Sequence, residues 1–516
     1  MTLYRFFEFV PAILAWSTLL IVVFASHYLP AAVAIFIILF DIYWLLKTIY
    51  LSLHLRYSFL RMRKYLKIDW RRRLEEEFSS VGTPTSGGAS ELKNWQDVYH
   101  LVILPMYKEP YGVVKESFDS LRRMNYPKDK FIVVLSAEER GGDEAKEVLK
   151  KIEEEFGRDF FKFMTTIHPA QIPGELQGKG SHETFAAKEA KKLIIDPAGI
   201  DYEKILVSVF DVDTQVPPNY FGRLTYAYLT AEHPQRSSYQ PVPLFHNNIY
   251  EAPVLARVVA MSATFWHMMQ QARPERLRTF SSHSMPFKAL VEVGFWQKDI
   301  VSEDSRIFWQ CYLHYDGDWR VVPLFYPVSM DANVAPTFWG TMANIYRQQR
   351  RWGWGIENIP YILHGFARNK AIPFGRKLFW SFHEVEGFHS WATNSLIIFA
   401  LGWLPIFLGG EIFNETILSF SLPKITRTIM TLSMVGIASS AILGLILLPP
   451  KPDWFKRRHY FLYLFQWLLI PVSLIVFGAF PALESQTRLM LGGRFRLDYW
   501  FTPKYRRKPE SIRENI

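Results

Sequence analysis

Two aspartates separated by one residue, Asp211 and Asp213, directly follow a short apolar stretch at 205–210. Carboxylates at positions i and i+2 beyond the end of a strand can meet one hard cation together with the phosphates that it carries. Mg2+ and Mn2+ prefer oxygen ligands and share them with phosphate oxygens. A lone Asp-x-Asp is most often a solvated turn, but its place after an apolar strand favours a cation–phosphate site.

A second apolar stretch ends in Pro105-Met106-Tyr107-Lys108-Glu109. An aromatic ring and a carboxylate at the exit of a strand can stack on a nucleobase and accept hydrogen bonds from it. The alternative is an ordinary helix start with Glu109 in its first turn. If it is not simply a helix start, this segment is a candidate nucleotide site.

The segment Gly178-Lys179-Gly180-Ser181 precedes a helical pattern. Glycines let the backbone approach a phosphate, and the ammonium of Lys179 can neutralise it. The segment is not a Walker motif, because the preceding glycine spacing is missing. A flexible basic turn remains the alternative.

Two later motifs supply further groups. Within Ser302-Glu303-Asp304, a carboxylate aimed at an acceptor hydroxyl could act as a general base. In Gln348-Gln349-Arg350-Arg351-Trp352, Arg351 could hold a leaving diphosphate and Trp352 could stack on a sugar. The alternatives are a surface acidic pair and a juxtamembrane basic stretch with an interfacial tryptophan.

The elements that would position these motifs alternate between strands and helices. We predict strands at 98–105, 131–136, 161–167 and 205–210, and helices at 110–125, 142–156 and 183–193. This alternation indicates an α/β fold with a mostly parallel sheet. Ligands of such sheets bind beyond the carboxyl ends of the strands, which is where the first two motifs lie.

Apolar runs flank this central block. The runs at 10–28 and 30–53 are each long enough to span a bilayer and form a tight hairpin. A cleaved signal peptide is a weak alternative, because Arg5 is the only basic residue ahead of the first run. A basic cluster follows the second run, which favours the cytosol for what comes next. We expect a multi-pass protein of a plasma or inner membrane with a cytosolic catalytic domain.

Three more apolar runs, at 390–408, 428–448 and 460–480, lie near the C-terminus. With five spans, the loop at 409–427 would lie outside, and so would the tail. Because the tail is basic, this position conflicts with the rule that basic residues stay inside. Either a sixth, weaker span exists or the last run bends back. We expect a membrane hairpin at 1–54, a basic linker at 55–97, a catalytic α/β domain at 98–365, an interfacial segment at 366–388, membrane helices at 389–482 and a basic tail at 483–516.

Composition narrows the function. Cys311 is the sole cysteine, which excludes an intramolecular disulfide and a multi-cysteine zinc site. Much of the net charge of +10 flanks the apolar runs, so membrane lipids rather than nucleic acid are the expected partner. Asp41 lies within the second run and has either a functional role or a partner on a neighbouring helix. The stretch at 79–90 is small, polar and rich in glycine, as is typical of a linker.

Taken in order, these motifs resemble the membrane-integrated family 2 glycosyltransferases, which include cellulose, chitin and hyaluronan synthases. Their signature is D, DxD and ED, followed by QxxRW. Asp211 and Asp213 match DxD, and Glu303 and Asp304 match ED. The last element is matched by Gln348, Arg351 and Trp352.

The resemblance implies a GT-A fold and roles for these residues. Tyr107 and Glu109 would bind the nucleotide, with Lys179 near the diphosphate. Asp213 would be the chief ligand of Mg2+ or Mn2+, and Asp211 would lie on the nucleotide-sugar or metal side. Asp304 would be the general base of a single displacement with inversion. The acceptor and diphosphate site would be formed by Glu303, Gln348, Arg351 and Trp352.

Two departures concern the family pattern. Glu138 stands where the family has an aspartate pair that binds the base, and residues 279–284 replace the cysteine-containing acceptor motif. The resemblance favours a UDP-sugar donor and a growing polysaccharide as acceptor, with export through the spans. Glycosylation of a membrane lipid is the alternative, and an inactive membrane scaffold or transporter is the alternative of another class.

Overall fold

A seven-stranded sheet forms the centre of the catalytic part. The computed structural model describes residues 2–78 and 94–506, so the predicted linker at 79–90 lies outside the described residues. The strand order is β3-β2-β1-β4-β6-β5-β7. Neighbours in β3-β2-β1-β4 are parallel, β6 is antiparallel to β4 and β5, and β5 is parallel to β7. The strands are β1 (Tyr99–Met106), β2 (Phe131–Glu138), β3 (Lys162–His168), β4 (Ile205–Val209), β5 (Ser237–Phe245), β6 (Ser284–Pro286) and β7 (Arg320–Met330).

This mostly parallel α/β sheet between apolar helices confirms the predicted fold class. The sheet is buried on both faces, which explains the near-continuous apolar sequence of its strands. Side chains alternate between the faces, so Leu101 and Ile103 of β1 enter one core and Val102 and Leu104 enter the other.

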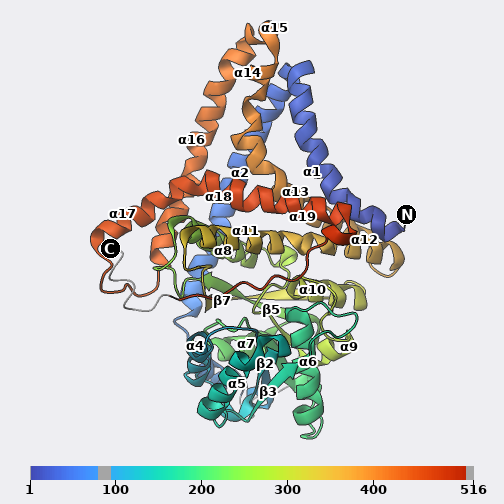
Figure 1. Cartoon of the computed structure of the whole chain (residues 1–516), viewed down its shortest axis with the longest axis vertical. Coiled ribbons are helices and arrows are strands. Elements are labelled where there is room, and N and C mark those ends of the chain that lie inside the picture. The colour runs from blue at the N-terminus through green and yellow to red at the C-terminus, as the bar shows by residue number, and fades with distance from the viewer. Residues whose placement is uncertain (1, 79–93, 507–516) are drawn as a thin grey trace.

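Helices cover both faces of the sheet (Figure 1). The core containing Val102 also receives α3 (Trp70–Phe78), α4 (Tyr111–Arg122), α5 (Gly142–Phe156) and α7 (Tyr220–Thr230). The core containing Leu101 receives α6 (Lys179–Ala190), α9 (Phe287–Glu292), α10 (Glu303–His314) and α12 (Asn358–Arg368).

One helix begins earlier than its sequence pattern predicts. The predicted helix at 183–193 starts at Lys179, because Lys179 is buried against Glu183 one turn further on. It continues after Ala190 as a π-helical turn, Lys191–Ile195. The consequence is that Lys179 lies in the first turn of a helix rather than in a loop.

Several long apolar helices stand above the sheet domain (Figure 1). By length and composition, α1 (Leu3–Tyr28), α2 (Pro30–Tyr65) and α16 (Ile417–Ile446) can each cross a membrane. The bent pair of α13 (Phe374–Phe399) with α14 (Leu404–Leu408) passes the same test as one span. These helices indicate that the protein is integrated into a membrane.

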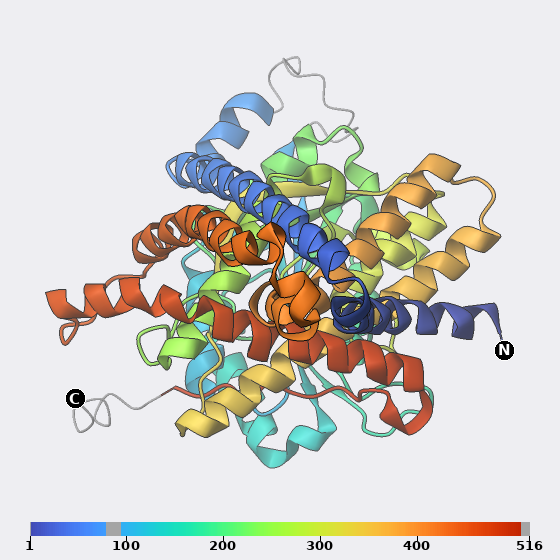
Figure 2. The same cartoon turned by 90° about the horizontal axis from the view of Figure 1, so that it is seen from above.

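The last apolar run has a different direction. Its helices α17 (Arg457–Phe465), α18 (Ile470–Leu474) and α19 (Phe480–Leu491) are apolar enough for a span as one segment. Figure 1 shows this segment lying across the direction of α1, α2 and α16, and Figure 2 shows it extended in the plane of the view from above. The tail after Leu491 therefore starts on the side of the sheet domain, as the bent-back alternative expects.

The sheet domain and the apolar helices share one core. The helix α2 continues past the predicted end of its apolar run at residue 53 and packs Leu55, Phe59 and Met62 against the sheet domain. Trp467 and Phe477 of the transverse segment belong to the same cluster. With a rise of about 1.5 Å per residue, this continuous helix reaches from the membrane part to the sheet and fixes the position of one relative to the other.

The transverse segment leads to a topology prediction. The sole cysteine, Cys311, is buried and should not react with a thiol reagent, so the labelling of a single introduced cysteine can be measured. We expect an impermeant thiol reagent to reach F374C and F495C from one side of sealed vesicles. It should reach I412C, in α15 (Gly410–Asn414), only from the other side, because the wild-type side chains are exposed at all three positions. Labelling of F495C from the same side as I412C would contradict the transverse arrangement.

Candidate active site

The Asp-Val-Asp motif follows β4 at the edge where the carboxyl ends of β1 and β2 also meet. Val212 is buried in the core, and its carbonyl accepts a hydrogen bond of 2.7 Å from the hydroxyl of Ser117. This anchor fixes the turn. Asp211 then pairs through Oδ1 with Lys179 Nζ at 2.8 Å, and its Oδ2 accepts from the Ser281 hydroxyl at 2.9 Å.

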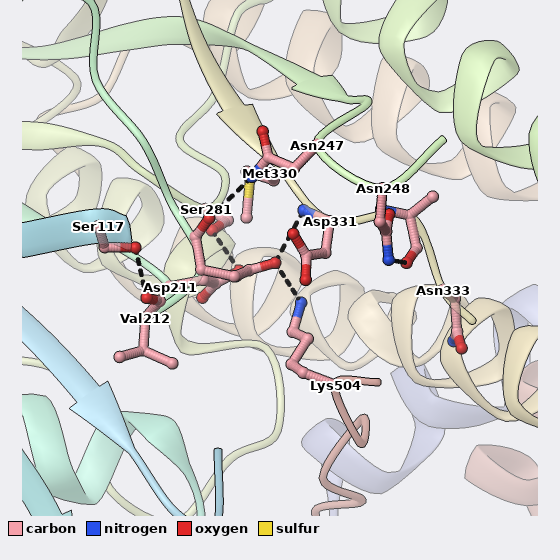
Figure 3. A network of polar contacts seen from close by, with 12 residues as sticks. Ser117, Asp211, Val212, Asn247, Asn248, Ser281, Met330, Asp331, Asn333 and Lys504 are labelled. Atoms are coloured by element: carbon pink, nitrogen blue, oxygen red, sulfur yellow. Dashed lines mark hydrogen bonds and ion pairs between the residues drawn. The ribbon is translucent and has the colours of Figure 1, made fainter. Parts of the chain in front are cut away.

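Asp213 lies deeper than Asp211, and its side chain is fully buried. Its Oδ2 accepts from the backbone N–H of Asp331 at 2.9 Å and pairs with Lys504 Nζ at 2.6 Å (Figure 3). Its Oδ1 is buried and has no hydrogen-bond partner within residues 2–78 and 94–506. Burial raises the pKa of Asp213, although Lys504 acts in the opposite direction. An oxygen of this kind can accept a further hydrogen bond or bind a cation.

Lys179 connects the motif to the helix α6. Its ammonium lies 2.8 Å from Asp211 and 3.2 Å from Glu183, a buried carboxylate that the sequence analysis did not identify. Although burial opposes it, the attraction of Asp211 and Glu183 raises the pKa of Lys179 well above its usual value. Lys179 is therefore a fixed positive charge. A Cβ at Gly180 would come within 2.9 Å of the Gln297 carbonyl, so this glycine allows close packing against the loop ahead of α10.

The candidate nucleotide residues lie at the ends of β1 and β2. Glu109 accepts a hydrogen bond of 2.7 Å from the backbone N–H of Tyr107, and burial raises its pKa to about 7. Glu138 pairs with His182 Nε2 at 2.7 Å and with Arg140. Burial would favour its neutral form, but His182 and Arg140 lower the pKa of Glu138. Glu138 is thus an oriented acceptor, and its partner Arg140 lies 5.2 Å from the centre of the Tyr107 ring.

The acidic pair opens the helix α10. Glu303 is buried, while Asp304 keeps partial access to the cavity and accepts from the backbone N–H of Ser305 at 2.7 Å. Burial raises the pKa of Asp304, and Lys179 and Arg351 partly oppose this rise. The pKa of Glu303 lies well above its usual value, first through burial and then through the charge of Asp304. A carboxylate whose pKa is shifted upward has a greater affinity for a proton, as a general base requires.

The Gln-x-x-Arg-Trp motif lies at the end of the helix α11 (Phe338–Gly353). Arg351 places its guanidinium 5.3 Å from the centre of the Tyr499 ring, and in the part of the chain that the structure describes its buried Nε has no hydrogen-bond partner. Gln348 accepts from Asn333 Nδ2 at 3.4 Å, and Trp352 packs against Phe245.

All of these candidate residues line one cavity of about 660 Å³. Its lining includes Tyr107, Glu109, Glu138, Lys179, Asp211, Asp213, Glu303, Asp304, Gln348, Arg351 and Trp352. The cavity continues between the apolar helices, where residues of α2, α13 and the transverse segment line it. Every site residue predicted from the sequence thus faces a shared space.

The C-terminal tail supplies residues that the sequence analysis missed. Tyr499, Phe501 and Lys504 line the same cavity. The centre of the Phe501 ring lies 5.1 Å from that of Tyr107, and a Cβ at Gly178 would come within 2.8 Å of the Tyr499 ring. The aromatic residues at 499–501 within a basic tail were the available signal, but spacing could not show that the tail returns to the sheet.

Glu357 is a second missed residue, and it holds the acidic pair in place. Its Oε1 accepts from the backbone N–H groups of Val301 and Ser302 at 3.1 and 3.0 Å and from the Ser302 hydroxyl at 2.7 Å. Its Oε2 accepts from the indole N–H of Trp354 at 3.0 Å. Glu357 therefore ties the start of α10 to the segment that follows the Gln-x-x-Arg-Trp motif.

Among the described residues, no three His, Cys, Asp or Glu side chains converge closely enough to hold a metal ion by themselves. Asp213 with its free Oδ1 nevertheless fits one ligand position of a hard cation, and Asp211 lies two residues away. Phosphate oxygens of a bound nucleotide would have to complete the coordination, as Mg2+ sites commonly require.

Comparable solved structures are glycosyltransferases. They include the mannosyltransferase PcManGT from Pyrobaculum calidifontis in complex with GDP-Man and Mn2+, at 16% identity and a TM-score of 0.42 over 77% of this chain and 98% of that chain. Residues 1–349 of S. aureus TarS in complex with UDP-GlcNAc give 13% identity and a TM-score of 0.35 over 67% and 90%. GalNAc-T7 with UDP, GalNAc and Mn2+ gives 12% and 0.31 over 63% and 57%.

No curated protein matches this sequence at a significant level. The family model described as glycosyl transferase family group 2 matches residues 206–479, from β4 to the transverse segment. The match contains the Asp-Val-Asp motif, the acidic pair of α10 and the Gln-x-x-Arg-Trp motif. Because it covers more than half of the chain, the protein belongs to glycosyl transferase family group 2.

Proposed function

We propose that this protein is an inverting, GT-A type glycosyltransferase that works at the cytosolic face of a membrane. It moves a sugar from a nucleoside-diphosphate donor, with UDP favoured by the family resemblance, to an acceptor in the cavity described above. The observation that carries the proposal is the convergence of Asp211, Asp213, Asp304 and Arg351 on that one cavity.

The donor's parts fit different walls of the cavity. The base lies between Tyr107 and Glu138, whose carboxylate accepts hydrogen bonds from N–H groups of the base. The diphosphate lies near Lys179 in the first turn of α6, where the ammonium and the helix dipole both favour negative charge. Arg351 faces the same region from α11 and stabilises the charge that develops on the leaving group.

Asp213 is the expected ligand of Mg2+ or Mn2+, with Asp211 beside it. The support is the buried Asp213 Oδ1 that lacks a partner. A bound cation supplies charge stabilisation for the departing diphosphate. Asp211 is already held by Lys179 and Ser281, so it orients the sugar side of the donor.

Asp304 is the proposed general base. It accepts the proton of the acceptor hydroxyl while that oxygen bonds to the anomeric carbon. The bond from that carbon to the diphosphate oxygen breaks, and the nucleoside diphosphate leaves with the bonding electrons. Glu357 maintains the position of Asp304 through the hydrogen bonds to Val301 and Ser302, because a displaced base loses its catalytic effect.

We expect Asp304→Asn to lower kcat by about 10²- to 10⁴-fold, since an amide cannot accept the proton. Donor binding should remain, because Asn has the same size as Asp. Sugar transfer to the acceptor, with hydrolysis of the donor subtracted, would be measured on the full chain. Nucleotide binding would be measured on the same protein. Asp299→Asn is the matched control, because Asp299 is exposed on the preceding loop and does not line the cavity. Full turnover of the Asp304 variant would reject this assignment and favour another base.

The acceptor enters from the membrane side of the cavity. Trp266, Trp380 and Trp391 line this part, and their flat faces suit the stacking of sugar rings. They favour a growing polysaccharide that leaves between the apolar helices. A lipid acceptor is a second candidate, because the basic residues Lys47 and Arg273 line the same end of the cavity.

Product length separates the two acceptors. With radiolabelled nucleotide sugars and the purified chain in lipid, a processive synthase should give a ladder of long products. We expect that ladder, because several tryptophans along the path can hold successive sugar units. A single labelled sugar that partitions entirely with lipid would contradict the polysaccharide and support the lipid acceptor.

A further inference from the structure

A third carboxylate, that of Asp331, stands beside the proposed cation site. Asp331 directly follows β7, is 4% exposed and lines the cavity. Its backbone N–H donates to Asp213 Oδ2 at 2.9 Å, which brings the two residues into direct contact. No motif in the sequence pointed to it.

The two carboxylates are now held by cations of the tail. Lys504 Nζ lies 2.6 Å from Asp213 Oδ2, and Arg506 donates to both oxygens of Asp331, at 2.7 and 3.2 Å (Figure 3 shows Lys504 and Asp331). Although burial opposes it, the charges of Asp213, Asp331 and Asp211 together raise the pKa of Lys504. The ammonium of Lys504 is thus paired with Asp213 and lies within the electrostatic influence of Asp331 and Asp211.

If the tail moved away, the carboxylate of Asp211 would keep its partners, and that of Asp331 would lose Arg506. Asp211 would keep Lys179 and Ser281, one on each carboxylate oxygen. Among the described residues, only Arg506 binds the two carboxylate oxygens of Asp331, and one oxygen of Asp213 has no partner. Two buried, ionised carboxylates without a counter-ion would be strongly unfavourable, and a divalent cation would compensate both of them.

We propose that Asp331 is the second protein carboxylate of the cation site, and that the divalent cation takes the place of Lys504 and Arg506. One divalent ion carries the same charge as the two side chains that it replaces. This inference rests on the proposed function. The tail is then an internal counter-ion that keeps Asp213 and Asp331 paired until the cation and the nucleotide bind together.

Mn2+ binding to the detergent-solubilised full chain tests this directly. Electron paramagnetic resonance of free Mn2+ would give the Kd with the metal alone and with added UDP. We expect Asp331→Asn to weaken Mn2+ binding by roughly 10- to 100-fold, the range seen when a supporting carboxylate of a metal site is lost. Arg506→Gln should strengthen binding of Mn2+ alone, because a competing cation is removed.

Glu116→Gln is the matched control. Glu116 also holds Arg506, but it is half-exposed and does not line the cavity. This variant loosens the tail without touching the cation site, so it should bind Mn2+ as well as the wild type or better. If Asp331 only anchored the tail, Asp331→Asn would behave in the same way, and that result would overturn the inference.

Two further measurements separate the possible failures. A thermal unfolding midpoint close to that of the wild type, and retained metal-free binding of UDP, would show that Asp331→Asn still folds. If the folded wild type bound no Mn2+ with or without UDP, the cation assignment of the proposed function would fail together with this inference. If the wild type bound Mn2+ and Asp331→Asn bound it equally, only this inference would fail.

Discussion

The compensation of buried charge is the constraint on which the rest of this structure depends. Lys179 pairs with Asp211 and Glu183, and Lys179 and Glu183 are buried, where an unpaired ion costs several kcal/mol. Each charge is tolerated only because the others hold it. Such an arrangement is fixed before any substrate arrives, so the electrostatic environment needs little reorganisation during the reaction.

The sheet provides this arrangement because it brings distant segments to one edge. Parallel pairing of β1 with β2 and β4 places Tyr107, Glu138 and Asp211 near one another, although they are far apart in the sequence. The helices α10 and α11 then bring Asp304 and Arg351 from the later half of the chain. The core shared with α2 fixes this edge relative to the apolar helices, so the cavity opens toward the membrane part.

The sequence predicted the elements whose patterns are local. Three predicted elements correspond to β1, β4 and α5, namely the strands at 98–105 and 205–210 and the helix at 142–156. Each predicted end lies within one residue of the observed end. The motifs were identifiable for the same reason, since each occupies a few consecutive residues. The antiparallel strand β6 was not predicted, because its three residues carry no periodicity of their own.

Residues that act through long-range contacts escaped the sequence analysis. Asp331, Glu357 and Lys504 have ordinary neighbours in the sequence, and their roles depend on partners 118, 56 and 291 residues away. The direction of the last apolar run was also open, because length and hydropathy describe a crossing helix and a surface helix equally well. In the structure this run is transverse, and Trp467 stacks against Phe265 of α8 (Val254–Gln271).

The central claim is that carboxylates from separate segments gather around one cation-bound sugar diphosphate. Anomalous scattering from crystals of the full chain grown with Mn2+ and UDP tests it most directly. The account predicts a single strong manganese peak between Asp213 and the diphosphate, with the ammonium of Lys504 moved away. Nucleotide bound elsewhere, or manganese absent from Asp213 while UDP occupies the cavity, would contradict it.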